Sequence, residues 1–213
     1  MPLPHRLLLL LIFAMLLIFV GQRFSPNSLV AYMAVPAEVT ASWEALRDGQ
    51  AGQAEARAFT TLLSAAFLHA DWDHLFFNML FLWVFAGLVG ELLGGRWLLA
   101  IFLLSAVGGS LGDVLSRPES TIPLLGASGA VMGFEGAYLG LAVRWQLPWP
   151  QIWPIAHPIP PLRLALVAVG GYILDIMGMV GPATGIAHGA HLGGFLVGLV
   201  LTSLIAPAPR HIS

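Results

Sequence analysis

The stretch Gly126-Ala127-Ser128-Gly129-Ala130 places one hydroxyl group between two glycines, at the start of the apolar run 130–143. Small residues in a membrane helix often serve only close helix packing. Two other apolar segments, however, also begin with polar residues: His74 with Asn78, and His188 with His191. Polar side chains at the starts of three separate segments are the pattern expected of a catalytic constellation.

The composition indicates a membrane protein. Of the 213 residues, 58% are hydrophobic and only 9% are charged, against roughly 25% charged residues in an ordinary soluble domain. The formal net charge of −2 gives no basic excess, so nucleic acid is not expected as a partner. The sequence contains no cysteine, which excludes disulfides, thiol catalysis and thiolate metal sites.

Six apolar segments are long enough, with their flanks, to cross a bilayer. They predict an all-α membrane protein, a six-helix bundle that forms one domain over residues 1–213. We count the first segment as a retained span, because no small residue stands where signal cleavage would need one. The predicted spans are about 7–21, 73–91, 97–112, 122–143, 162–180 and 186–205.

The distribution of arginine predicts the orientation of these spans. Six spans put both termini on one side, and the short segments on that side hold Arg6, Arg96, Arg144, Arg163 and Arg210, against Arg117 opposite. The positive-inside rule therefore favours cytoplasmic termini, and we expect a multi-pass protein of the bacterial inner (plasma) membrane. Spans two, four and six then begin on the outer face. At about 1.5 Å per residue, Ser128 and His191 are expected roughly 8 Å inside their spans.

Polar groups at that depth are costly unless they are paired or face a water-filled cavity. The residue types suit acyl transfer, with Ser128 as nucleophile and a histidine as general base. The Asn78 amide, the Ser128 backbone amide and His74 can donate to an oxyanion, although a structural role for His74 is equally open. Close packing between spans is expected at four glycines: Gly126, Gly129, Gly194 and Gly198.

Three motifs together resemble the rhomboid intramembrane serine proteases. They are His74-Leu-Phe-Phe-Asn78, Gly126-Ala-Ser128-Gly and Ala190-His191-Leu-Gly-Gly194 followed by Gly198, on alternate spans. The resemblance implies a six-helix bundle in which Ser128 and His191 form a catalytic dyad without metal or cofactor, and in which His74 and Asn78 contribute to the oxyanion site. It also implies single-span membrane proteins as substrates, cut near or within their helix in a lipid environment.

Four positions stand outside this simple pattern. Met132 occupies a place where the family usually has an aromatic residue. Glu135 is an unusual charge in mid-span, to which we assign a structural role. Asp175 lies near the expected depth of Ser128, so a third triad member is conceivable; because the resemblance implies a dyad, we assign Asp175 to structure as well. His188 is expected nearer the water, in a solvated or cavity-lining position.

Two other classes of function remain open. A polytopic transporter or metal carrier could use His74, His188 and His191 as ligands, and the last two share a helix face. An inactive rhomboid-like protein could bind membrane clients as a scaffold. A serine-reactive fluorophosphonate probe separates these classes, because only the protease is expected to react at Ser128.

Overall fold

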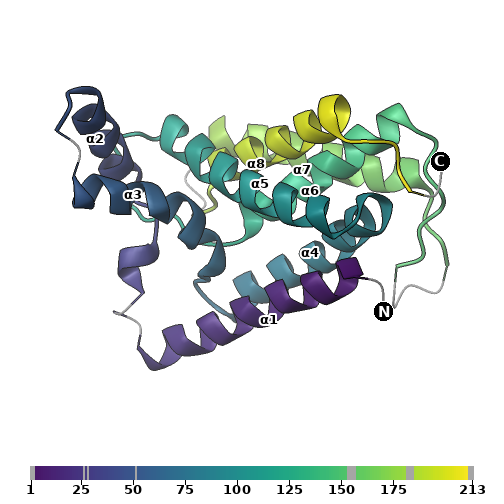
Figure 1. Cartoon of the computed structure of the whole chain (residues 1–213), viewed down its shortest axis with the longest axis horizontal. Coiled ribbons are helices and arrows are strands. Elements are labelled where there is room, and N and C mark those ends of the chain that lie inside the picture. The colour runs from purple at the N-terminus through teal and green to yellow at the C-terminus, as the bar shows by residue number, and fades with distance from the viewer. Residues whose placement is uncertain are drawn as a thin grey trace.

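The computed structural model describes residues 3–25, 27, 29–50, 52–152, 157–180 and 185–210. Within these residues the chain is almost entirely helical (Figure 1), and the β pairing they contain is one isolated bridge between Ala34 and Leu124. The α-helices are α1 (Leu3–Phe24), α2 (Pro36–Arg47), α3 (Gln53–Ser64), α4 (Trp72–Leu93), α5 (Gly95–Ser116), α6 (Ser128–Arg144), α7 (Pro161–Val180) and α8 (His188–Val200). Short turns flank them: 3₁₀ helices η2 (Val30–Tyr32) and η3 (Ala65–Phe67), and a π-helical turn η4 (Leu201–Ile205).

The predicted all-α membrane fold is confirmed. Five helices are long and apolar enough to cross a membrane: α1 from Arg6, α4, α5, α7, and α8 continued through η4. The remaining predicted span corresponds to α6, which has 17 residues. At about 1.5 Å per residue it is roughly 26 Å long, slightly less than a hydrocarbon core of about 30 Å.

The predicted start of the fourth span, near residue 122, is wrong. Residues 120–127 form an extended loop, because Leu124 pairs with Ala34 and because Gly126 has a φ of 122°, a backbone conformation that glycine adopts readily. Helix α6 therefore begins at Ser128 itself. His191 is the fourth residue of α8, so neither residue lies as far from the start of its helix as the expected depth of roughly 8 Å.

Helix α6 lies in the middle of the bundle, in contact with α4, α5, α7 and α8. Glycines allow its backbone to touch that of α8. A Cβ atom at Gly194 would overlap the carbonyl oxygen of Gly129, and one at Gly198 would overlap that of Gly133. Helix α5 approaches α8 in the same way, since a Cβ at Gly112 would overlap the carbonyl oxygen of Gly189. These three helices form the tightly packed centre of the molecule (Figure 1).

Both ends of the described chain lie on one side of the bundle (Figure 1). Helix α1 packs on α4 through the fully buried Leu8, Met15 and Phe19. Near its start, Leu7 lies beside Gly95, the first residue of α5, and the backbone amide of Arg210 donates to the Leu92 carbonyl near the end of α4 at 2.9 Å. The six predicted spans, an even number, would place the two ends in this way.

The long polar loop after α1 contains α2 and α3, which pack on each other and on α5. Val39, Leu62 and Val114 form a small buried cluster between these three helices. Helices α2 and α3 lie at the end of the bundle away from the chain ends (Figure 1), close to where α6 and α8 begin.

We expect Gly198→Ala to destabilise the fold, because the added methyl group would collide with the Gly133 backbone rather than with a flexible side chain. Overpacking of this kind costs roughly 1–3 kcal/mol. Gly170→Ala in α7 is the matched control, since a Cβ there meets nothing within 4 Å, and it should be neutral or stabilising by up to about 1 kcal/mol. Thermal unfolding in detergent measures both; equal midpoints would contradict the packing argument.

Candidate active site

A cavity of about 860 Å³ lies among the starts of α4, α6 and α8, the loop before α6, and the end of α7. Its wall includes all four residues predicted for the chemistry, Ser128, His191, His74 and Asn78, and also His188. Helices α4, α6 and α8 all begin at this cavity, so each contributes its polar side chains from its first two turns.

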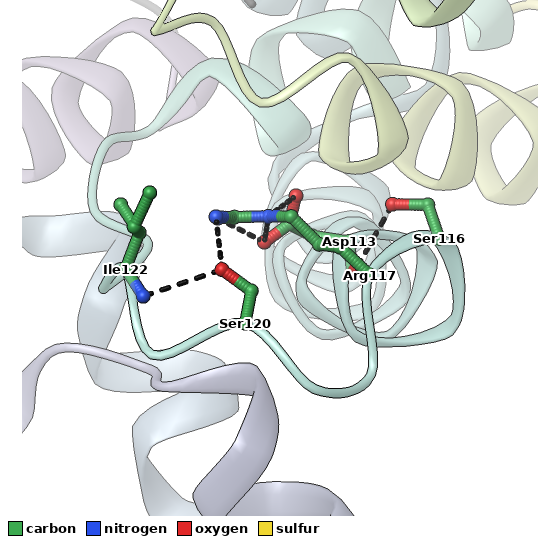
Figure 2. Close-up of polar contacts among 5 residues, drawn as sticks. All are labelled: Asp113, Ser116, Arg117, Ser120 and Ile122. Carbon is green, nitrogen blue, oxygen red and sulfur yellow. Dashed lines mark hydrogen bonds and ion pairs between the residues drawn. The ribbon is translucent and has the colours of Figure 1, made fainter.

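The loop that leads to Ser128 is anchored at its start to the end of α5. Figure 2 shows the Arg117 guanidinium donating to both carboxylate oxygens of Asp113, at 2.6–3.0 Å, and to the Ser120 hydroxyl at 3.0 Å. That hydroxyl oxygen in turn accepts from the Ile122 amide at 3.2 Å, and the Ser116 hydroxyl donates to the Asp113 carbonyl at 2.9 Å. Asp113 is 1% exposed, and the bidentate pair with Arg117 compensates its charge.

The second half of the same loop is held by backbone pairing. Ala34 and Leu124 exchange two hydrogen bonds, of 3.1 and 2.7 Å, and the Gly126 amide donates to the Ala65 carbonyl at 2.9 Å. The Ala127 amide then donates to Nε2 of His69 at 3.4 Å. Hydrogen bonds therefore hold the loop at several points between residues 120 and 127. Because many of their partners are far away in the sequence, the position of Ser128 depends on the tertiary structure.

Sequence reasoning gave His69 no role, although it stands in the segment between η3 and α4 that adjoins the first motif. The ring is 1% exposed, and the His69 amide donates to Oε1 of Gln22 at 3.1 Å. Burial, together with the neighbouring His74, lowers the pKa of His69 to about 4. The ring therefore stays neutral near pH 7 and can accept from the Ala127 amide directly before the serine.

Ser128 is the first residue of α6, where backbone amides have no acceptor within the helix. The first helical hydrogen bond runs from the Val131 amide to the Ala127 carbonyl at 3.0 Å, and no side chain caps this end. The helix dipole adds positive potential at the same point. The half-buried Ser128 thus lies beside backbone donors that suit a developing negative charge.

The α4 side of the cavity presents His74 and Asn78. Asp71 caps the helix by accepting from the His74 amide at 2.8 Å, and Nδ1 of His74 accepts from the Ala70 amide at 3.4 Å. That contact places the ring proton on Nε2, which faces Gly126, where a Cβ would come within 2.7 Å. Asn78 uses one amide hydrogen on the His74 carbonyl at 2.8 Å and keeps the second.

The α8 side of the cavity presents His188 and His191, whose rings are arranged edge to face with their centroids 6.3 Å apart. Both Nδ1 atoms lie within hydrogen-bonding distance of one oxygen of Asp175 in α7, at 2.6 Å for His188 and 2.8 Å for His191. In the described part of the chain, the recorded contacts include no hydrogen bond between Ser128 and His191. Catalytic contacts of this kind are often long in the absence of substrate.

The same cluster could also hold a metal ion. Among the described residues, the possible ligand atoms of Asp175, His188 and His191 all lie within 4.8 Å of one another. His74, the third ligand in the metal-carrier alternative, does not belong to this group.

Two further residues singled out in the sequence are buried in α6. Met132 packs with Ala168 and Phe195, and Glu135 is 5% exposed.

These features define a class of protein: a helical membrane protein with a serine and several histidines around a cavity at the starts of its central helices. Comparison with known proteins identifies the family within that class. Residues 56–208 match the model of the Rhomboid domain, so the chain belongs to the rhomboid family.

Individual relatives agree with this assignment. The chain is 33% identical over 156 residues to rhomboid-like protein 11, chloroplastic, of Arabidopsis thaliana, an alignment that covers 71% of this chain and 54% of the relative. It is 29% identical to rhomboid protein 1, mitochondrial, of Saccharomyces cerevisiae (70% and 42% covered), and 30% identical to rhomboid-like protease 3 of Toxoplasma gondii (70% and 55%). The chain thus spans about half the length of these relatives, and the family includes proteins named as proteases.

The depressed pKa of His69 predicts a pH-dependent stability. In the unfolded chain this histidine takes up a proton near pH 6.5, whereas the folded protein resists protonation until about pH 4. Between these values the unfolded state binds more protons, so the free energy of unfolding should decrease as the pH falls, by about 1.4 kcal/mol per pH unit. In His69→Gln, thermal unfolding midpoints across this window should fall less steeply than in the wild type. Parallel pH profiles would contradict a buried neutral ring.

Proposed function

We propose that this protein is an intramembrane serine endopeptidase that cleaves single-span membrane proteins near or within their helix. The observation that carries the proposal is the single cavity wall shared by Ser128, His191, His74 and Asn78. Membership of the rhomboid family supports it, as does the placement of the serine at the unpaired start of a helix.

In the first half of the reaction, the Ser128 oxygen attacks the carbonyl carbon of the scissile peptide bond while its proton passes to Nε2 of His191. The electron pair of the carbonyl moves to its oxygen, which becomes the oxyanion. Three hydrogen-bond donors are available for that charge: the backbone amide at Ser128, the free amide hydrogen of Asn78 and Nε2–H of His74. The positive end of the α6 dipole adds a favourable potential.

In the second half, His191 returns the proton to the leaving amine as the carbon–nitrogen bond breaks, which leaves an ester on Ser128. Water then enters the cavity, gives a proton to His191 and attacks the ester carbonyl. As the ester bond breaks, His191 gives this proton to the Ser128 oxygen, which releases the new carboxyl terminus and restores the serine hydroxyl. No step needs a metal or cofactor.

A peptide bond inside an intact helix has a hydrogen-bonded carbonyl, so attack requires local unwinding of the substrate. Glycine or proline near the cut makes unwinding easier by roughly 1–3 kcal/mol. We therefore propose that substrates contain helix-destabilising residues with a small residue before the cut.

We propose a bacterial inner membrane as the location, with cytoplasmic termini, because of the arginine distribution. Two of the relatives above are named as chloroplastic or mitochondrial.

Loss of the nucleophile should abolish catalysis without loss of the fold. We expect Ser128→Ala to remove cleavage of a transmembrane substrate and labelling by a fluorophosphonate, measured on purified protein in lipid with and without a chelator. Ser105→Ala is the matched control, since it removes a hydroxyl that is fully buried in α5 and lies outside the cavity, and it should still label.

Turnover by Ser128→Ala near the wild-type rate would refute the nucleophile. A wild-type protein that neither cleaves nor labels would favour a client-binding scaffold or a metal carrier instead. Activity that the chelator removes would show that the reaction depends on a metal.

Removal of one oxyanion donor should slow the reaction without stopping it. For Asn78→Ala we expect turnover to fall roughly 10²-fold, because the Ser128 amide and His74 remain. Asn27→Ala, which alters an exposed asparagine outside the cavity, is the control for the substitution. Steady-state cleavage of one fluorescent transmembrane substrate measures both; an unchanged rate for Asn78→Ala would reduce that residue to a packing role.

A further inference from the structure

We propose that Asp175 is a positioning residue for the general base. By accepting a hydrogen bond from Nδ1 of His191, it fixes the ring in the tautomer and orientation that leave Nε2 free to take the serine proton, while His188 holds Asp175 in place. This inference rests on the proposed function and goes beyond the two-residue dyad that the family resemblance implies.

The first support is the burial pattern of α7. Within this helix the buried residues are Leu164, Ala165 and Ala168 in its first half, and then only Asp175. Most of the C-terminal half is exposed, including Leu174 and Met177, while Tyr172 and two glycines are partly buried. A carboxylate that is the one buried side chain of an otherwise apolar and mostly exposed half-helix needs polar partners, and both of its hydrogen-bond partners come from α8.

The second support is the geometry of the two histidine contacts. His188 and His191 are three residues apart, so both rings project from one side of α8, and one oxygen of Asp175 lies between them at 2.6 and 2.8 Å from the two Nδ1 atoms. Gly178, one turn after Asp175, completes the contact, because a Cβ there would overlap the His188 ring. The start of α8 thus docks on the end of α7 through this cluster.

The chemistry of the acceptor decides the tautomer. An ionised carboxylate oxygen can only accept hydrogen bonds, so each contact requires a proton on Nδ1. In the neutral His191 ring, the lone pair then lies on Nε2, the nitrogen opposite Nδ1. When His191 takes the serine proton and becomes positively charged, the same carboxylate stabilises the charge, as in a serine–histidine–aspartate triad.

His188 has a different part in this arrangement. Its shorter contact with the shared oxygen restrains Asp175 from the other side, so that the carboxylate does not rotate away from His191. His188 is therefore not an alternative base but a support for Asp175. Loss of this support should weaken the positioning without removing it, because the contact between Asp175 and His191 remains.

The test uses the full-length protein in lipid with Asp175→Asn as the main variant. The asparagine amide can donate to Nδ1 of a histidine, which favours the opposite tautomer, and in a serine–histidine–aspartate protease such a change lowers turnover about 10⁴-fold. We expect kcat to fall by roughly 10²- to 10⁴-fold with KM nearly unchanged, and fluorophosphonate labelling to slow in parallel. His188→Ala should keep measurable activity, and Glu135→Gln, a buried acid in α6 outside the cavity, should stay close to the wild type.

A second measurement does not depend on activity. The ¹⁵N resonances of His191, assigned with His191→Ala, should show a proton on Nδ1 in the resting wild-type protein and on Nε2 in Asp175→Asn. A proton on Nε2 in the wild type would overturn the inference even if Asp175→Asn failed to fold, and even if the wild type proved inactive.

The remaining outcomes are equally decisive. Wild-type kcat in Asp175→Asn would overturn the positioning role while leaving the protease proposal intact. Lower activity with an unchanged His191 tautomer would overturn it in favour of helix docking alone. Wild-type activity that falls on treatment with a chelator would show that the cluster works as a metal site, which would also overturn it.

Discussion

The close contact between the backbones of α6 and α8 is the constraint on which the rest of the structure depends. Gly129 and Gly133 in α6 face Gly194 and Gly198 in α8, and any side chain at the latter pair would meet a carbonyl oxygen. Apolar side chains cannot drive two helices together within lipid, so association relies on this kind of close packing. The same contact brings the starts of both helices to one end of the bundle, where the cavity lies.

Polar side chains at this end are tolerated because each makes at least one hydrogen bond or faces the cavity, although Nδ1 of the buried His69 has no partner among the described residues. His69 accepts from the backbone before the serine, His74 accepts from Ala70, and Asp175 is shared by the two histidines of α8. The start of α6 remains uncapped. A helix end without a cap is normally unfavourable, but here it leaves donors available at the point where the proposed reaction develops negative charge.

The loop of residues 117–127 connects stability with function. Its ion pair between Arg117 and Asp113, its pairing with Ala34 and its contact with Ala65 hold the approach to Ser128. These contacts come from α5, from the segment before α2 and from η3. The region of α2 and α3 therefore contributes to the site by fixing the backbone from which the serine projects, although none of its own residues lines the cavity.

The sequence alone determined the membrane class, the helical fold and the four polar residues that share one cavity wall, because hydrophobic length and the polar residues beside apolar runs are local properties of the chain. It misplaced the start of α6, because the extended loop is set by pairing with Ala34 and Ala65, far away in the sequence. It assigned Asp175 to structure and gave His69 no role. Only the tertiary structure decided that Asp175 meets two histidines and that His69 supports Ala127, because hydrogen bonds between helices depend on their relative rotation and docking.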